Sequence, residues 1–213
     1  MYLAAGAPYD PNGDVNGTID TEYVRLYARS GTEWNMIQQI NRTRSSDDFG
    51  WSLDLSHDGS MLAISTLYDA VYMYKLSTSS FLYELVHTTD NIDAREISVS
   101  GDGMVVGVAF WSNRTARIYE RIGDGFQQRG ADILGYGYGG GIALNYDGTI
   151  AIVGDLFWDS DTAIHIGRAA VFQWRDDNED GSMEWMQMGS DITGDAAGDY
   201  LGYDGVYLSR MTA

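Results

Sequence analysis

A fourfold internal repeat constrains the fold of this chain more than any other feature. Its clearest element is an alternating strand, repeated as YVRLY, AVYMY, TARIY and AVFQW at residues 23–27, 70–74, 115–119 and 170–174. The second residues of these strands are separated by 47, 45 and 55 positions. Propeller blades of four strands have a period of this size, so the repeat predicts a β-propeller.

Each unit also contains three further predicted strands. A strand with an aromatic residue follows the alternating strand, at Trp34, Phe81, Phe126 and Trp185. A short alternating strand comes next, and a tight turn leads from it to small apolar strands such as MLAIS, VVGVA and IAIVG. Three of these turns contain Asp-Gly, the dipeptide best suited to the positive φ angles of a hairpin, at residues 58–59, 102–103 and 147–148. No segment keeps an apolar helical period for three turns, so the predicted fold class is all-β.

The two ends of the chain complete the strand pattern. YLAAG, from residue 2, matches the small apolar strand without its preceding partner, and GVYLS, from residue 205, matches that missing partner. We therefore predict a single domain over residues 1–213, a closed propeller of four four-stranded blades in which the terminal strands pair. The predicted units span residues 1–47, 48–91, 92–136 and 137–199, with 200–213 completing the first blade. The alternative is a fragment of a larger propeller, which leaves open sheet edges.

Two short motifs carry a family resemblance. Phe49-Gly50 and Gly6-Ala7-Pro8 look like the FG and GAP elements of FG-GAP repeats, which build integrin-α-like propellers. The segments DFGWSLDLSHDGSMLAIS and QQRGADILGYG are also similar to a variant of these repeats in surface and secreted proteins of marine microbes. A weaker similarity to WD40-type repeats runs through SHDGSMLAIS, although no Trp-Asp dipeptide ends the third strand. The resemblance implies an extracellular or cell-surface adhesion module.

Calcium is the cofactor that this resemblance implies, because integrin-type repeats carry a DxDxDG loop between the two elements. Here that interval is SHDGSM, with Asp58 as its one carboxylate. Calcium takes six to eight oxygen ligands, so a single carboxylate cannot hold it. Integrin-style calcium binding is therefore not expected at these turns.

Two other loops are candidate calcium sites. In the first, Asp176, Asn178 and Asp180 alternate and Glu184 follows, which matches the first half of an EF-hand-type loop. Its twelfth position is Gln187 rather than an acidic residue, and the competing interpretation is a solvated hairpin tip.

The second candidate calcium loop lies near the N-terminus. Asp10, Asn12 and Asp14 place oxygen ligands at alternate positions. The Gly and Asn content of this segment fits a plain connecting loop equally well.

Aromatic residues at predicted strand ends are candidate ligand contacts. Trp51, Trp111 and Trp158 occupy strand ends or the loops that follow, where an exposed indole can stack on a sugar. Tyr136 and Tyr138, in the glycine-rich GYGYGGG, would add to one rim. The alternative for these positions is aromatic packing between blades.

The charge of the chain limits its partners. With 31 Asp and Glu against 13 Lys and Arg, the formal net charge is −18. Such a surface repels nucleic acid phosphates and anionic lipid headgroups. No apolar stretch is long enough to span a bilayer, and the first ten residues lack the segments of a signal peptide. We expect no nucleic acid partner and no membrane insertion.

Catalytic motifs are not evident. His57, His87 and His165 lie in different units, each without an evident nucleophile partner, and no sialidase-like SxDxGxTW box is present. We therefore predict a non-enzymatic binding or adhesion propeller, extracellular or at the cell surface, with a protein or glycan ligand. The alternatives are a structural repeat segment of a larger protein, or a carbohydrate-active propeller enzyme or lectin.

Overall fold

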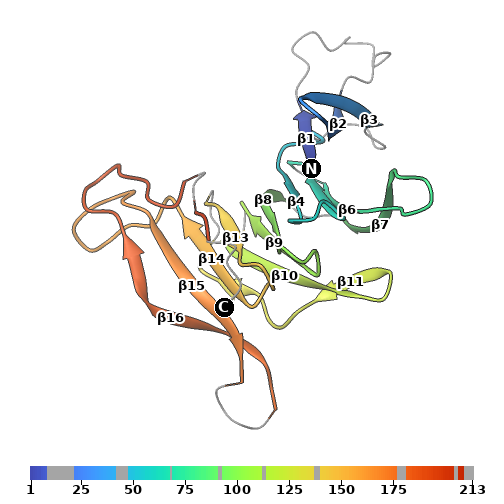
Figure 1. Cartoon of the computed structure of the whole chain (residues 1–213). Coiled ribbons are helices and arrows are strands. Elements are labelled where there is room, and N and C mark those ends of the chain that lie inside the picture. Colours follow the sequence, from blue (N-terminus) through green and yellow to red (C-terminus); the bar gives the residue numbers. More distant parts are fainter. Residues whose placement is uncertain are drawn as a thin grey trace.

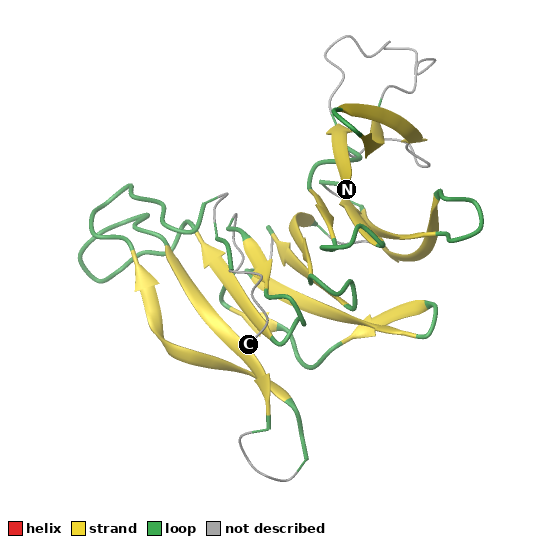
Figure 2. Cartoon of the chain, viewed as in Figure 1, coloured by secondary structure: helices red, strands yellow, loops and turns green. Residues whose placement is uncertain are grey.

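The chain folds into β-strands connected by turns. A computed structural model describes residues 1–8, 22–41, 48–67, 69–90, 93–111, 114–136, 140–176, 181–203 and 206–208. Within these residues there are sixteen strands and no helix (Figure 2). None of them therefore lies in a helix long and apolar enough to cross a lipid bilayer. The predicted all-β class is confirmed.

The strands form four antiparallel sheets, numbered 1 to 4 in chain order. Sheet 1 contains β1 (Tyr2–Ala7), β2 (Tyr23–Ser30) and β3 (Glu33–Asn41). Sheet 2 contains β4 (Leu53–Leu55), β5 (Met61–Ser65), β6 (Ala70–Leu76) and β7 (Tyr83–Asp90). Sheet 3 contains β8 (Ala94–Val99), β9 (Val105–Phe110), β10 (Thr115–Ile122), β11 (Gly125–Gln128) and β12 (Ile133–Leu134), which pairs with β10. Sheet 4 contains β13 (Ile142–Leu144), β14 (Ile150–Asp155), β15 (Arg168–Arg175) and β16 (Glu184–Thr193).

The Asp-Gly turns have the backbone that the sequence predicts. Gly59, Gly103 and Gly148 have φ angles of 72°, 72° and 64°, at which a residue with a side chain would be strained. The side chain of the aspartate before each glycine accepts a hydrogen bond from the backbone N–H two residues after the aspartate. In the first turn, the distance from the Ser60 nitrogen to Asp58 Oδ1 is 2.8 Å. These carboxylates therefore close the turns.

The core lies between successive sheets. Val24 and Leu26 of sheet 1 pack on Leu62 and Ile64 of sheet 2, and these four side chains are fully buried. Two further apolar clusters join sheet 2 to sheet 3 and sheet 3 to sheet 4. The sheets consequently follow one another in series, with sheet 1 (blue) and sheet 4 (orange) at opposite ends of the arrangement (Figure 1).

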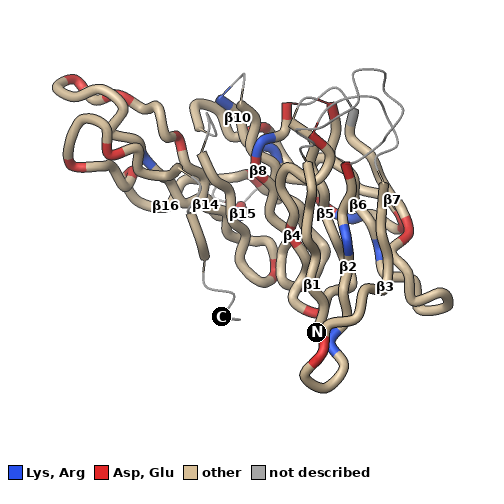
Figure 3. The backbone as a smooth tube through the Cα atoms, turned by 90° about the horizontal axis from the view of Figure 1, so that it is seen from above, with Lys and Arg blue, Asp and Glu red and all other residues tan. Residues whose placement is uncertain are grey.

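The acidic residues are spread over the molecule. Figure 3 shows the positions of Asp and Glu (red) at many places along the backbone, with fewer positions of Lys and Arg (blue). This distribution agrees with the formal net charge of −18.

The predicted pairing of the two terminal strands is not formed among the described residues. Strand β1 pairs with β2, and residues 206–208 are not part of a strand. They line a pocket beside β13 instead, and the Gly141 N–H donates a 3.0 Å hydrogen bond to the Gly202 carbonyl just before them. Val206 is buried, and residues 206–208 share the pocket with Gly141, Ile142, Ala143 and Leu144.

Candidate ligand-binding rim

Loops from three sheets meet on one face of the arrangement. Strands β5, β9 and β14 end there, and β4 and β8 begin there, because Leu53 pairs with Ile64 and Ala94 pairs with Phe110 in antiparallel register. The Asp-Gly turns lie on the opposite face. This face carries the set of side chains that we call the aromatic rim: Trp51, Arg95, Trp111, Phe157, His165 and Tyr200.

Arg95 connects the rim residues of sheets 2 and 3. Its guanidinium carbon lies 4.1 Å from the ring centroid of Trp111 and 5.4 Å from that of Trp51. Both distances are within the range of favourable cation–π attraction. The two indoles, 60 residues apart in sequence, are therefore held around one cation.

Phe157 continues the rim into sheet 4. Its ring meets Trp111 edge-on at 5.8 Å, His165 at 5.3 Å and Tyr200 at 6.0 Å. His165 and Tyr200 stack at 5.6 Å, with His165 Nδ1 and Tyr200 Oη 3.5 Å apart. Edge-to-face and stacked arrangements at these separations are the favoured aromatic geometries.

Two rim residues have an unusual backbone. His165 and Tyr200 have φ angles of 53° and 51°, in the left-handed region that large side chains disfavour. The Tyr200 N–H donates to the His165 carbonyl at 3.1 Å, and the His165 N–H donates to Asp159 at 2.6 Å. Disfavoured conformations of this kind collect at functional sites.

The rim is accessible to a ligand. Trp51 and Tyr200 are each 38% exposed, and Arg95, Trp111, Phe157 and His165 are half-buried. A neighbouring cluster extends it: the Arg168 guanidinium lies 5.2 Å from the ring of Trp158, which is also half-buried. The accessible surface therefore includes Trp111 and Trp158, two of the predicted ligand contacts.

Tyr136 packs against the guanidinium of Arg168, the residue that also contacts Trp158. The Arg168 guanidinium lies 4.2 Å from its ring, and the Tyr136 hydroxyl donates a 2.7 Å hydrogen bond to Asp191, which also accepts from Arg168 at 2.8 Å. Burial, together with the bond to Asp191, raises the pKa of Tyr136 to about 12. Tyr136 is buried with its hydroxyl engaged, so it positions Arg168.

A buried carboxylate anchors the loop ends beneath the same cluster. Asp155 is fully buried at the end of β14, where the Arg114 guanidinium donates to it at 2.5 Å. The Nε atom of Arg168 lies 3.7 Å from the same carboxylate oxygen. Two cations from sheets 3 and 4 thus compensate one buried charge, which ties the loops of the two sheets together.

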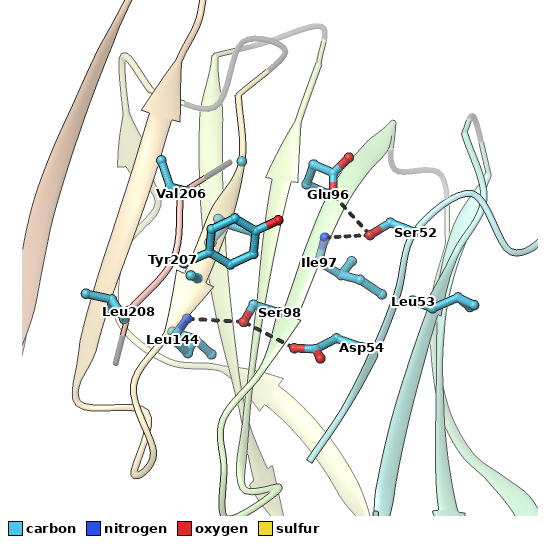
Figure 4. A pocket seen from close by; sticks show the side chains of 13 residues that line it. Ser52, Leu53, Asp54, Glu96, Ile97, Ser98, Leu144, Val206, Tyr207 and Leu208 are labelled. Carbon is cyan, nitrogen blue, oxygen red and sulfur yellow. Dashed lines mark hydrogen bonds between the residues drawn. The ribbon is translucent and has the colours of Figure 1, made fainter. Parts of the chain in front are cut away.

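A central pocket adjoins the rim (Figure 4). It has a volume of about 220 Å³ and lies between β4, β8, β13 and residues 206–208. Ser52 donates to Glu96 at 3.1 Å, and Ser98 donates to Asp54 at 3.4 Å. Trp51 and Arg95 directly precede Ser52 and Glu96, which connects the pocket to the rim. The two carboxylates thus link β8 to β4 and to Ser52 just before it.

The candidate calcium loops are only partly described. Asp176 accepts a 2.7 Å hydrogen bond from the Gly181 N–H, and Glu184 is exposed at the start of β16. The remaining predicted calcium ligands lie outside the described residues, namely Asn178, Asp180, Asp10, Asn12 and Asp14. The predicted ligand contact Tyr138 also lies outside them. Within the described ranges, no three His, Asp or Glu side chains form a group that could hold a metal ion.

Four rim residues were not predicted from the sequence, namely Arg95, Phe157, His165 and Tyr200. Phe157 could have been found by repeat alignment, because it follows β14 much as Trp111 follows β9. The other two histidines pack on aromatic rings, His57 on Tyr146 at 6.1 Å and His87 on Phe126 at 6.0 Å.

The fold resembles solved propeller-type structures. No protein-family model and no curated protein matches the chain. A functionally unknown protein from Desulfotomaculum acetoxidans DSM 771 matches with a TM-score of 0.57 and 14% identity, over 82% of this chain and 50% of that one. Chaetomium thermophilum Sqt1, bound to the N-terminus of the ribosomal protein L10, matches with a TM-score of 0.54 and 14% identity, over 81% of this chain and 42% of that one. A candidate 6-phosphogluconolactonase from Bacteroides fragilis NCTC 9343 matches with a TM-score of 0.53 and 10% identity, over 82% of this chain and 52% of that one.

These comparisons define a class. The identities are too low to carry function, so they show the fold alone: an all-β, β-propeller-like arrangement of repeated antiparallel sheets. The chain spans about half the length of these three structures.

Proposed function

We propose that this chain is a non-enzymatic binding module of the propeller type, working outside the cell or at its surface in the manner of FG-GAP-like adhesion repeats. Its ligand lies across the aromatic rim, and a protein segment is the ligand class that we favour. Loops on a rigid scaffold are the usual place for such contacts.

The observation that carries this proposal is the Trp51–Arg95–Trp111 stack. Two partly exposed indoles on either side of a guanidinium provide a large, rigid contact area at low entropic cost. Trp, Tyr and Arg are the residues that dominate binding energy at protein interfaces. Phe157 and Tyr200 extend the same surface across sheet 4.

Charge favours a basic ligand. The chain carries a formal net charge of −18, and Asp159 and Asp161 are exposed in the loop that leads to His165. Long-range attraction speeds the association of oppositely charged partners. Sqt1, which shares the fold, was solved with the N-terminus of a ribosomal protein, so a protein segment is a compatible ligand for this architecture.

The proposed absence of catalysis rests on how the acidic groups are used. Asp54 accepts a hydrogen bond from the Val99 N–H, Glu96 accepts from Ser52, and Asp155 is ion-paired. Each has a structural role in linking sheets. The similarity to a candidate lactonase, at 10% identity, concerns the fold.

Ligand arrays with matched variants test the proposal. Peptide and glycan arrays would be probed with the native chain, and the best ligand titrated against Trp51→Ala and Trp111→Ala. We expect peptide hits rich in Lys and Arg, and affinity losses of about tenfold or more in both variants. Trp34→Ala is the control, because Trp34 is 41% exposed on β3, outside the rim.

Two results would contradict the proposal. Equal affinity of all three variants would place the ligand elsewhere, and blank arrays would favour the structural-repeat alternative. Glycan hits alone, lost on Trp111→Ala, would support the lectin alternative at the same rim.

A further inference from the structure

Arg95 occupies a β-bulge in strand β8. Its two neighbours in the strand pair with consecutive residues of β9, Ala94 with Phe110 and Glu96 with Ala109. Arg95 is therefore an extra residue with no partner in the register. The pairings of β4 with β5 and of β13 with β14 have no such shift. Bulges redirect a side chain and are common beside functional sites, so the bulge gives sheet 3 a feature at the aromatic rim that sheets 2 and 4 lack.

The guanidinium of Arg95 keeps its hydrogen-bonding capacity. Its central carbon lies over the rings of Trp111 and Trp51, at 4.1 Å and 5.4 Å from their centroids, and neither contact is a hydrogen bond. Within the described part of the chain, Arg95 has no hydrogen-bond or ion-pair partner. Each of the other described arginines has one, namely Arg25, Arg29, Arg114, Arg117, Arg121, Arg129, Arg168 and Arg175. Because Arg95 is only half-buried, its N–H groups are within reach of a ligand.

Hydrogen bonds beside the stacked residues fix their positions. The Ser52 hydroxyl, next to Trp51, donates at 3.1 Å to Glu96, the residue after the bulge (Figure 4). The Trp111 N–H donates at 3.2 Å to the carbonyl of Asp93, two residues before the bulged position. The indoles and the guanidinium are therefore in place before a ligand arrives, which lowers the entropic cost of binding.

The chemistry of a guanidinium with unused N–H groups selects a carboxylate. Its planar fork matches the two oxygens of a carboxylate, and the resulting hydrogen bonds are charge-assisted. A phosphate offers similar oxygens with more negative charge, and the chain has a formal net charge of −18. Repulsion grows with the charge of the ligand and acts over about 8 Å at physiological salt. A singly charged carboxylate is therefore the favoured anion.

We propose that Arg95 binds a carboxylate of the ligand through two parallel hydrogen bonds, while the indoles of Trp51 and Trp111 cover the apolar groups next to that carboxylate. This inference rests on the proposed function, because it names the chemical group that the ligand presents to the aromatic rim. The net charge of the chain favours basic residues elsewhere in the same ligand. The ligand is therefore a basic protein segment with one exposed carboxylate, either its C-terminus or an acidic side chain.

Small probes test which chemical group is recognised. N-acetylphenylalanine presents a C-terminal carboxylate, its α-amide is the neutral match, and N-acetylglutamic acid α-amide presents a side-chain carboxylate. In NMR titrations of the native chain, we expect at least one carboxylate to shift the Nε–H signal of Arg95 and to bind about tenfold more tightly than the neutral amide. The carboxylate that binds more tightly identifies the source. Equal affinity for the carboxylates and the neutral amide, or tighter binding of inorganic phosphate, would overturn the proposal.

Conservative variants separate recognition from packing. Arg95→Lys keeps a cation beside the indoles but loses the fork, so the preference for the carboxylate over the neutral amide should fall to about twofold or less. Arg25→Lys is the matched control, since Arg25 also lies over an aromatic ring, that of Tyr23 at 4.4 Å, outside the rim. Urea unfolding of both variants shows that they are folded. A loss of stability in Arg95→Lys with an unchanged preference would show that Arg95 serves only to pack the two sheets together.

The best array ligand distinguishes this inference from the proposed function. Amidation of its carboxylates should weaken binding to the native chain by about tenfold. If amidation changes nothing while Trp51→Ala and Trp111→Ala still weaken binding, the rim is the site and the carboxylate inference is wrong. If both tryptophan variants bind the ligand normally, the ligand does not lie on the rim and the proposed function itself is wrong.

Discussion

The carboxylate of Asp54 in β4 accepts a 2.7 Å hydrogen bond from the backbone N–H of Val99 in β8, a strand of the next sheet. Ser98 repeats the contact one sheet further, accepting from the Leu144 N–H at 3.1 Å. Strands β4, β8 and β13 belong to different sheets and share no backbone ladder, so these side chains supply polar links between them, beside backbone bonds such as that from the His57 N–H to the Gly101 carbonyl. At β13 the equivalent residue is Ala143, which has no side-chain acceptor.

Removal of this link should destabilise the fold. Asp54→Ala leaves the Val99 N–H without its acceptor, which costs about 1–3 kcal/mol of unfolding free energy. Asp54→Asn keeps a carbonyl oxygen at the same place and should recover most of the loss. Urea unfolding of the three proteins measures the difference, and equal stability of the native chain and Asp54→Ala would show that the link contributes nothing.

A pair of glycine variants tests the packing of sheet 3 on sheet 4. Gly148 and Gly123 both have positive φ, at 64° and 61°, so alanine is strained at either position. A Cβ at Gly148 would also overlap the side chain of Val105, whereas Gly123 has open space around it. Gly148→Ala should therefore be less stable than Gly123→Ala by about 1–3 kcal/mol. Equal melting temperatures would mean that the two sheets do not meet at this turn.

The Asp-Gly turns predict a loss of stability in acid. Burial alone would raise the pKa of Asp147, but hydrogen bonds from the Thr149 hydroxyl and N–H outweigh it, and the net pKa is lowered. A lowered folded-state pKa means that the contribution is present above the unfolded value of about 3.9 and is lost as the pH falls through the folded value. Asp147→Asn should lose less stability than the native chain between pH 5 and pH 2, as measured by urea midpoints. If the urea midpoints of the variant and the native chain fell equally between pH 5 and pH 2, Asp147 would not have this role.

Tyr136 predicts the opposite behaviour in alkali. Its pKa is raised to about 12, so its contribution to stability is present below the unfolded value of about 10 and is lost as the pH rises toward 12. Tyr136→Phe should remove one late step from the tyrosinate absorbance titration. The variant also leaves Asp191 with Arg168 and Gln187 as its remaining described partners. A titration curve identical to that of the native chain would show that Tyr136 ionises with the exposed tyrosines.

The strands and their turns were predictable because their signals are local. Alternation identified β2, β6, β10 and β15, and Asp-Gly identified three hairpins. The location of residues 206–208 was not predictable, since the sequence pattern indicates a short alternating strand without specifying which sheet it joins. That choice depends on long-range contacts, such as the hydrogen bond from the Gly141 N–H to the Gly202 carbonyl.

The candidate site was predictable only in part, for a related reason. Trp111 follows a strong strand signal, so a loop position could be assigned to it. Arg95 lies within a strand and gave no signal of its own, and its role depends on Trp51 and Trp111 approaching it from two different sheets. Tyr136 looked like a rim residue in its glycine-rich segment, yet the structure buries it under Arg168.

A ligand that binds across the aromatic rim will change the surroundings of particular tryptophans, and their indole N–H signals in NMR spectra report this. The chain has six tryptophans, so six resolved signals can be assigned with single Trp→Phe variants. On titration with the best array ligand, we expect the signals of Trp51 and Trp111 to shift while those of Trp34 and Trp185 stay in place. Shifts at Trp34 or Trp185, with Trp51 and Trp111 unmoved, would show that the ligand does not bind at the aromatic rim.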